Sequence, residues 1–189
     1  MGFVIRPNNL NSYGGLTGLR LALDTPAMVQ TLVLLEPPML ATPLGQSFFA
    51  GPIAPVIAAF QKGENDKAAD LFCQAVAGPN AVDGLVQLLG SGALAQARRD
   101  AGTVFGNEFA EIEKGLFTEA DAAKIAVPAL SVVGKDSHEL FGGSHAMLMK
   151  WLPKVEGLEV AQATHFLQVE QPSAVAEGIA RFVAKHPIR

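Results

Sequence analysis

The sequence predicts an α/β fold in which a parallel sheet is interrupted by a helical insertion. Two apolar runs, at residues 31–35 and 129–133, are bounded by proline or glycine, which is typical of strands buried on both faces of a sheet. Segments with helical patterns accompany these runs, and such alternation favours parallel strands. Between the runs, residues 39–120 are rich in Ala, Leu, Gln, Glu and Lys, which indicates a block of helices.

The N-terminal region is predicted to contain a helix at residues 12–23, followed by the first apolar run. Gly14, Gly15 and Gly18 lie along one side of this helix. Because glycine in a helix costs about 1 kcal/mol relative to alanine, we expect close packing of this helix on the sheet to offset the loss. A further short strand is expected at residues 3–5. In the helical insertion, helices are predicted at residues 52–61, 66–77, 81–89, 93–101 and 109–116.

The C-terminal region alternates again. The second apolar run is followed by a predicted helix at residues 144–151, a short strand at 158–161 and an amphipathic helix at 172–185 that begins with proline. We therefore expect a parallel sheet of three or four strands. In such sheets the functional residues lie in loops at the carboxyl ends of the strands. Those loops are residues 11–15, 36–38, 134–143 and 163–167.

Composition narrows the possible functions. The chain of 189 residues has a net charge of −4, which argues against a nucleic-acid partner. Apolar residues make up 49% of the chain and charged residues 17%, but no stretch approaches 18 uninterrupted apolar residues, so no membrane partner is expected. The lone Cys73 excludes a disulfide within the chain and a cysteine-based zinc site, and it fits a cytoplasmic protein.

Three of the predicted loops each hold one member of a possible catalytic triad. Ser12 opens a helix, Asp136 follows the second apolar run, and His165 follows the strand at 158–161. A serine hydroxyl is a weak nucleophile that needs a nearby base, and the base needs a carboxylate to fix its tautomer. The order Ser, Asp, His along the chain differs from the orders of chymotrypsin-like and subtilisin-like enzymes.

Three motifs resemble those of the α/β-hydrolase family. They are residues 11–15 (NSYGG), 132–137 (VVGKDS) and 163–172 (ATHFLQVEQP), which are similar to the family's nucleophile elbow, acid loop and histidine loop. The resemblance covers residues 12–189 and implies that the chain corresponds to the C-terminal part of such a fold. In the elbow pattern G-x-S-x-G, Leu10 stands in place of the first glycine.

The resemblance implies roles for particular residues. Ser12 would be the nucleophile, Asp136 the acid and His165 the base, and the backbone N–H of Tyr13 would be an oxyanion donor. Residues 1–38 and 121–189 would form the core of a partial α/β-hydrolase fold, and residues 39–120 would form a helical lid inserted into it. The family implies no metal and no organic cofactor.

Several alternatives remain open at this point. Glu36 follows the first apolar run and competes for the role of acid, since some α/β-hydrolases place the acid there; otherwise we expect Glu36, with Phe166, to line the substrate pocket. A serine at a helix start is commonly only an N-cap. His138 and His145 match no spacing of metal ligands.

The expected function is that of a serine hydrolase acting on a small or medium apolar ester, or on a related acyl or C–C substrate. The alternative is a non-catalytic fragment or a module that binds an apolar ligand. We expect weak turnover, because the resemblance places one oxyanion donor in a segment that precedes the elbow. We also expect an open sheet edge to favour self-association of the chain.

Overall fold

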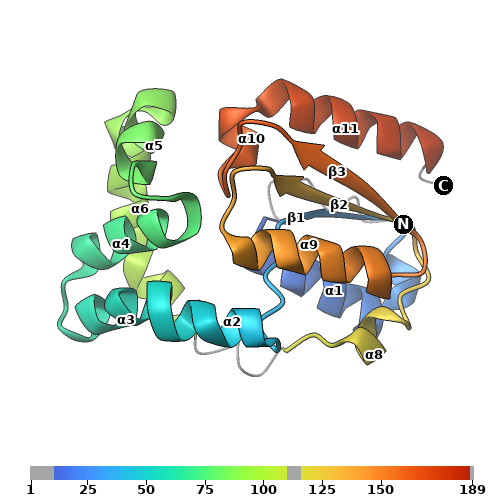
Figure 1. Cartoon of the computed structure of the whole chain (residues 1–189), viewed down its shortest axis with the longest axis horizontal. Coiled ribbons are helices and arrows are strands. Elements are labelled where there is room, and N and C mark those ends of the chain that lie inside the picture. Colours follow the sequence, from blue (N-terminus) through green and yellow to red (C-terminus); the bar gives the residue numbers. More distant parts are fainter. Residues whose placement is uncertain (1–10, 110–115, 188–189) are drawn as a thin grey trace.

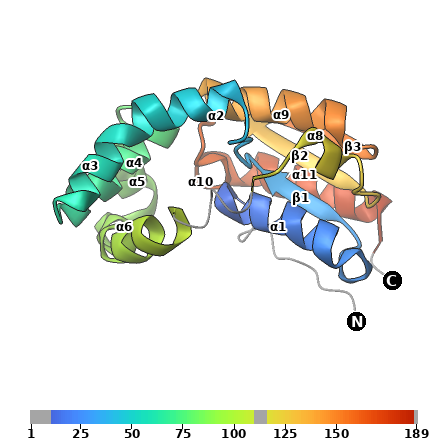
Figure 2. The same ribbon diagram turned by 90° about the horizontal axis from the view of Figure 1, so that it is seen from below.

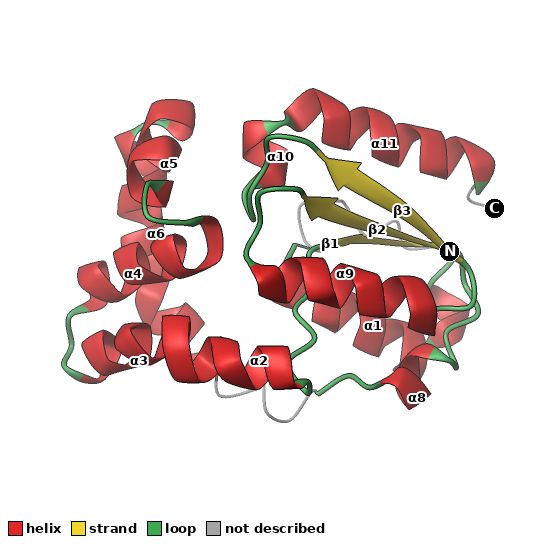
Figure 3. Cartoon of the chain, viewed as in Figure 1, coloured by secondary structure: helices red, strands yellow, loops and turns green. Residues whose placement is uncertain are grey.

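The computed structural model describes residues 11–109 and 116–187, and its centre is a three-stranded parallel sheet (Figures 1 and 3). The strands are β1 (Leu32–Leu35), β2 (Ala129–Gly134) and β3 (Val155–Val160), in the order β1-β2-β3. In register, Leu32 lies opposite Ala129, which lies opposite Val155. The predicted parallel sheet is therefore confirmed. The third strand begins three residues earlier than predicted, and the expected strand at 3–5 lies outside the described residues.

Helices cover both faces of the sheet. Along β1, Leu32 and Leu34 pack into a core with α1 (Tyr13–Asp24) and α9 (Glu139–Trp151), whereas Val33 and Leu35 pack beneath α11 (Pro172–Lys185). This alternation follows from the two-residue period of a strand, and it explains why the whole run is apolar. Gly15 and Gly18 are buried in α1, in agreement with the predicted close packing of this helix.

The chain between β1 and β2 is mostly helical, and these helices are called the helical block below. The block lies beside the carboxyl ends of the strands, towards which the arrowheads in Figure 1 point, and Figure 2 shows it from below. Its own core includes Val56, Ala68 and Phe105. The elements are α2 (Pro43–Phe48), η3 (Phe49–Ile53), α3 (Ala54–Gln61), α4 (Asn65–Ala77), α5 (Ala81–Leu89), α6 (Ser91–Thr103) and η4 (Val104–Glu108).

Short elements complete the chain, and one helix differs from its prediction. A turn of 3₁₀ helix, η2 (Pro26–Met28), precedes β1, while α8 (Glu119–Ala122) precedes β2 and α10 (Leu167–Glu170) precedes α11. Helix α9 begins at Glu139 rather than at residue 144, because the side-chain Nδ1 of His138 accepts a hydrogen bond from the N–H of Leu140 and caps the helix. Most of the helix predicted at 109–116 lies outside the described residues.

Two further features bear on possible partners. Residues Pro43–Gln61 form a helical stretch of 19 residues with a mean hydropathy of 1.3, which by length and composition alone could cross a bilayer. The stretch contains the π-helical turn η3, and Phe48, Ile53 and Val56 are buried against the rest of the helical block. At the sheet edge, Asn11 forms an isolated parallel bridge with Leu35. Self-association through this edge stays a prediction.

Candidate active site

Ser12 has a backbone conformation that few non-glycine residues adopt. Its φ is 55° and its ψ is −121°, and its N–H donates to the carbonyl oxygen of Leu35 at 2.9 Å. The side chain makes no capping hydrogen bond to α1, so Ser12 does not act as an ordinary N-cap. A strained serine on a sharp turn into a helix is the geometry that exposes a nucleophilic hydroxyl in a nucleophile elbow.

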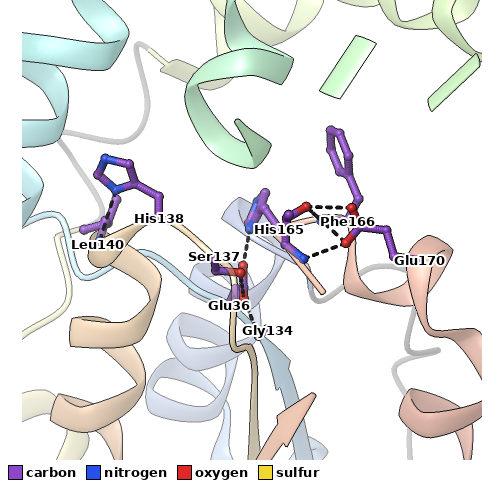
Figure 4. A network of polar contacts seen from close by, with 9 residues as sticks. Glu36, Gly134, Ser137, His138, Leu140, His165, Phe166 and Glu170 are labelled. Carbon is purple, nitrogen blue, oxygen red and sulfur yellow. Dashed lines mark hydrogen bonds and ion pairs between the residues drawn. The ribbon is translucent and has the colours of Figure 1, made fainter. Parts of the chain in front are cut away.

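Glu36 lies at the carboxyl end of β1 and holds His165 (Figure 4). Its Oε2 lies 2.6 Å from Nδ1 of His165, while its Oε1 accepts hydrogen bonds from the N–H of Gly134 at 2.7 Å and from the hydroxyl of Ser137 at 2.5 Å. Glu36 is only 2% exposed, and its φ of 49° places it in the left-handed region. A buried carboxylate with three donors is well satisfied, and this one is placed to fix the tautomer of the imidazole.

Asp136, the residue predicted as the acid, does not contact His165 in the structure; Glu36 does. Asp136 is exposed, and its N–H donates to the carbonyl oxygen of Ala163 at 3.0 Å. No described residue bonds to its carboxylate, and the carboxylate on His165 belongs to Glu36. The loop after β2 thus contributes Ser137, one residue further along, as a donor to Glu36 rather than an acid to His165.

The loop that carries His165 is fixed from both sides. On one side, the N–H and hydroxyl of Thr164 donate to the carboxylate of Glu170 at 2.6 and 2.9 Å. On the other side, the ring of Phe141 stacks on the imidazole at 3.9 Å between ring centroids and with 12° between planes. Because Nδ1 is engaged by Glu36, Nε2 is the ring nitrogen left to exchange a proton with a substrate or a nucleophile.

Gly134, at the end of β2, lies against the loop that carries His165 and against Glu36. A Cβ at this position would lie 2.2 Å from the carbonyl oxygen of Ala163 and 2.8 Å from Oγ of Ser137. Only glycine therefore allows the end of β2 to approach the histidine loop while its N–H reaches Glu36.

A cavity of about 400 Å³ lies between the sheet end and the helical block and opens on Ser12 and Tyr13. Its wall is largely apolar. Tyr13 is the first residue of α1, and a first-turn N–H has no partner within its helix. The other lining residues are Asn11, Gly14, Pro38, Leu40, Phe48, Phe49, Ile53, Phe72, Val76, Val104, Glu108, Phe109 and Phe141.

Neither residue predicted to line the pocket does so. Glu36 lies behind the imidazole of His165 and is almost fully buried. Phe166 lines a separate hollow of about 290 Å³, together with Leu85 and Leu88 of α5. Both residues lie away from this cavity, because a position next to a strand end or beside His165 in the sequence does not determine the side to which the side chain points.

Ser12 and His165 are not yet hydrogen-bonded to each other. Both lie beside Phe141, since Ser12 shares the cavity wall with this ring and His165 stacks on it. In unliganded active sites such hydrogen bonds are often long and tighten only when substrate is bound. The geometry thus joins Glu36 and His165 directly and leaves Ser12 without a hydrogen bond to the imidazole.

Other titratable groups lie outside this arrangement. Nδ1 of His145 lies 2.9 Å from the hydroxyl of Ser131, and burial lowers the pKa of His145. Burial raises the pKa of the Cys73 thiol to about 11, which makes it a poor nucleophile. Within the described ranges, no three His, Cys, Asp or Glu residues come together in a way that would hold a metal ion.

Comparison with known proteins bears on the fold. No family model matches the sequence, and no curated protein matches it either. Solved structures do match: a thermophilic esterase (TM-score 0.70, 21% identity), Est816, an N-acyl homoserine lactone degrading enzyme (0.65, 21%), and an alpha/beta hydrolase from Sphaerobacter thermophilus (0.65, 19%). These matches cover 95%, 92% and 90% of this chain. The chain has a partial α/β-hydrolase fold.

The α/β-hydrolase fold is partial because the chain spans 66%, 65% and 64% of the length of those three structures, respectively. Strands β1 to β3 with their helices supply the sheet end at which Ser12, Glu36 and His165 lie. The sequence analysis named all three residues as candidates, and the structure shows that Glu36 rather than Asp136 contacts His165.

Proposed function

We propose that this α/β-hydrolase-fold chain is a serine hydrolase in which Ser12 is the nucleophile, His165 the base and Glu36 the acid. The observation that carries the proposal is the buried Glu36–His165 pair at 2.6 Å, set at the same sheet end as a serine with a strained backbone. Burying a carboxylate and an imidazole together is costly, and such arrangements concentrate at functional sites.

The proposed reaction is acyl transfer to water in two halves. Nε2 of His165 takes the proton of Ser12 as Oγ attacks the substrate carbonyl, and Glu36 stabilises the imidazolium that forms. The N–H of Tyr13 donates to the oxyanion of the tetrahedral intermediate. The imidazolium then protonates the leaving group, and a water activated by the same histidine hydrolyses the acyl-enzyme.

The cavity supports a small or medium apolar acyl group, and a related C–C substrate fits the same machinery. Its volume of about 400 Å³ lies within the usual range for small-molecule pockets. Phenylalanine side chains from both the core and the helical block line it. We propose accordingly that residues 39–120, which include the helical block, act as a lid over the core formed by residues 1–38 and 121–189.

The test is labelling with a fluorophosphonate probe, followed by mass-spectrometric mapping of the modified residue. We expect the label on Ser12 and loss of labelling in Ser12→Ala, with Ser47→Ala, a substitution of an exposed serine, as the matched control. The same variants are assayed with p-nitrophenyl butyrate. Labelling at another residue, or undiminished turnover by Ser12→Ala, would contradict the proposal.

A second candidate function is binding without turnover. The absence of a hydrogen bond between Ser12 and His165 favours it, since the cavity would hold an apolar ligand whether or not the nucleophile is engaged. Ligand binding combined with no labelling of Ser12 would support this candidate over the hydrolase.

A further inference from the structure

Glu108 is an unusual carboxylate. It lies at the end of η4, lines the cavity that contains Ser12, and is half-buried. No described residue forms an ion pair or hydrogen bond with its side chain. Every other described carboxylate that lacks such a partner is exposed to solvent. These residues are Asp66, Asp83, Glu119, Asp136 and Glu139. Glu108 is thus the described carboxylate that combines partial burial with the lack of a partner among the described residues.

Burial without a partner is costly for a carboxylate, and the described half-buried or buried carboxylates elsewhere in the chain meet that cost with donors. Asp70 is bonded by both Nε and Nη2 of Arg98, and Glu170 by Thr164. The environment of Glu108 instead offers apolar side chains and the open volume of the cavity. A partner for its charge can therefore come from a molecule in that cavity.

Aromatic rings next to Glu108 favour the same class of ligand. Phe109 follows it in the chain, and its ring centroid lies 6.1 Å from that of Phe49 and 5.8 Å from that of Phe72. All three phenylalanines line the cavity. The faces of aromatic rings attract cations, most strongly where water is excluded. A carboxylate and aromatic rings that line one cavity together offer the chemistry that recognises an organic ammonium group.

We propose that Glu108 and these phenylalanines form a subsite for a cationic ammonium group, so that the substrate is an apolar ester carrying an amine. That the ligand is a substrate rests on the proposed function, whereas binding of an ammonium group at the subsite requires only the cavity. Ser12 and Glu108 line the same cavity, so one ligand can place its carbonyl at the serine and its ammonium group at the carboxylate.

The experiment compares two ligands of nearly equal shape that differ in charge, 3-tert-butylphenol and 3-hydroxyphenyltrimethylammonium. Binding of each to the full chain is measured by isothermal titration calorimetry. We expect the cation to bind about tenfold more tightly than the neutral isostere, in keeping with a cation–π contact reinforced by a carboxylate. Equal or weaker binding of the cation by the wild-type chain would overturn the proposal without any variant.

Substitution then assigns the preference to Glu108. In Glu108→Gln, which keeps the shape and removes the charge, the two ligands should bind within about twofold of each other. Glu119→Gln, a substitution of an exposed carboxylate outside the cavity, should keep the full preference. A preference that survives Glu108→Gln would refute the subsite.

The variant Ser12→Ala separates this inference from the proposed hydrolase activity. We expect it to abolish ester turnover while the ratio of the two binding constants stays at the wild-type value. If the wild-type chain does not hydrolyse esters but shows the charge preference, the hydrolase proposal fails and the subsite stands. If the wild-type chain hydrolyses neutral esters and shows no charge preference, the subsite fails and the hydrolase proposal stands.

Discussion

The ring of Phe141 lies flat against the imidazole of His165, with 3.9 Å between their centroids. The contact covers one face of the imidazole and restricts its rotation. It also favours the imidazolium that the proposed catalysis would create. We expect Phe141→Leu to lower kcat/KM about tenfold, since aromatic pairs of this kind are worth ~0.5–1.5 kcal/mol. Phe182→Leu in α11 is the matched control, because both rings are 1% exposed. A comparable loss of activity in the control would assign the effect to stability.

Replacement of Glu36 should distinguish the two candidate acids. Glu36→Gln presents an amide to Nδ1 of His165 and favours the wrong tautomer, so we expect kcat to fall roughly 10³–10⁴-fold. Asp136→Asn alters an exposed carboxylate and should leave kcat within about twofold. Steady-state kinetics with p-nitrophenyl butyrate measure both. The opposite ranking would return the acid's role to Asp136.

Ser137 should act as a positioning residue through Glu36. Its hydroxyl donates to Oε1 at 2.5 Å, and Ser137→Ala leaves that oxygen with the N–H of Gly134 alone. We expect kcat to fall about tenfold while KM is unchanged, because a hydrogen bond to a charged group is worth ~1.5–3 kcal/mol and part of it is replaced by the remaining donor. Ser137→Thr, which keeps the hydroxyl, should restore part of the rate. Equal rates for Ala and Ser at this position would remove the proposed role.

Gly134→Ala should disrupt the site by displacing a loop. The added Cβ would meet the carbonyl oxygen of Ala163 at 2.2 Å, so the histidine loop must shift. We expect a lower melting temperature, and little activity at temperatures where the variant is still folded. Gly142→Ala in α9 is the control: nothing lies within 4 Å of its added Cβ, and alanine should stabilise the helix by about 0.5–1 kcal/mol. Thermal unfolding by circular dichroism reports both changes.

His145 should make the stability of the fold sensitive to mild acid. Burial lowers its pKa below the ordinary 6.5, an effect that the negative charge of Glu159 partly opposes. The folded state therefore binds fewer protons at this site than the unfolded state does, so stability falls as the pH drops through and below about 6.5. We expect His145→Gln to reduce the difference in melting temperature between about pH 7.5 and pH 5.5. An unchanged difference would show that other groups govern this interval.

The positions of the strands follow from the sequence because their pattern is strong. Leu32–Leu35 and Ala129–Gly134 are continuous apolar runs between breakers, and both faces of the sheet are covered in the structure. The first half of β3 was missed because it contains Glu156 and Gly157, which are typical of loops. The first turn of α9 was missed because its cap is a histidine, and Gly142 and Gly143 weaken the helical pattern.

The carboxylate that contacts His165 could not be chosen from the sequence because the pattern locates strand ends and not side-chain directions. Glu36 and Asp136 both follow a buried strand. The left-handed backbone of Glu36 directs a longer side chain inwards to His165, and the N–H of Gly134 and the hydroxyl of Ser137 fix it there. Neither a backbone angle of this kind nor a contact across about a hundred residues leaves a periodic signal in the sequence.

The wall of the cavity is shared between two parts of the molecule. Tyr13 and Phe141 come from the sheet side, whereas Ile53, Phe72 and Val76 come from the helical block. A bound ligand would contact both parts at once. It would add apolar contacts between them, as the side chains of a hydrophobic core do. Binding would therefore stabilise the folded chain: a ligand at a hundred times its Kd raises the free energy of unfolding by about 2.7 kcal/mol. A shift in melting temperature is therefore a direct way to recognise a ligand of this cavity among many compounds, whether or not the chain turns it over.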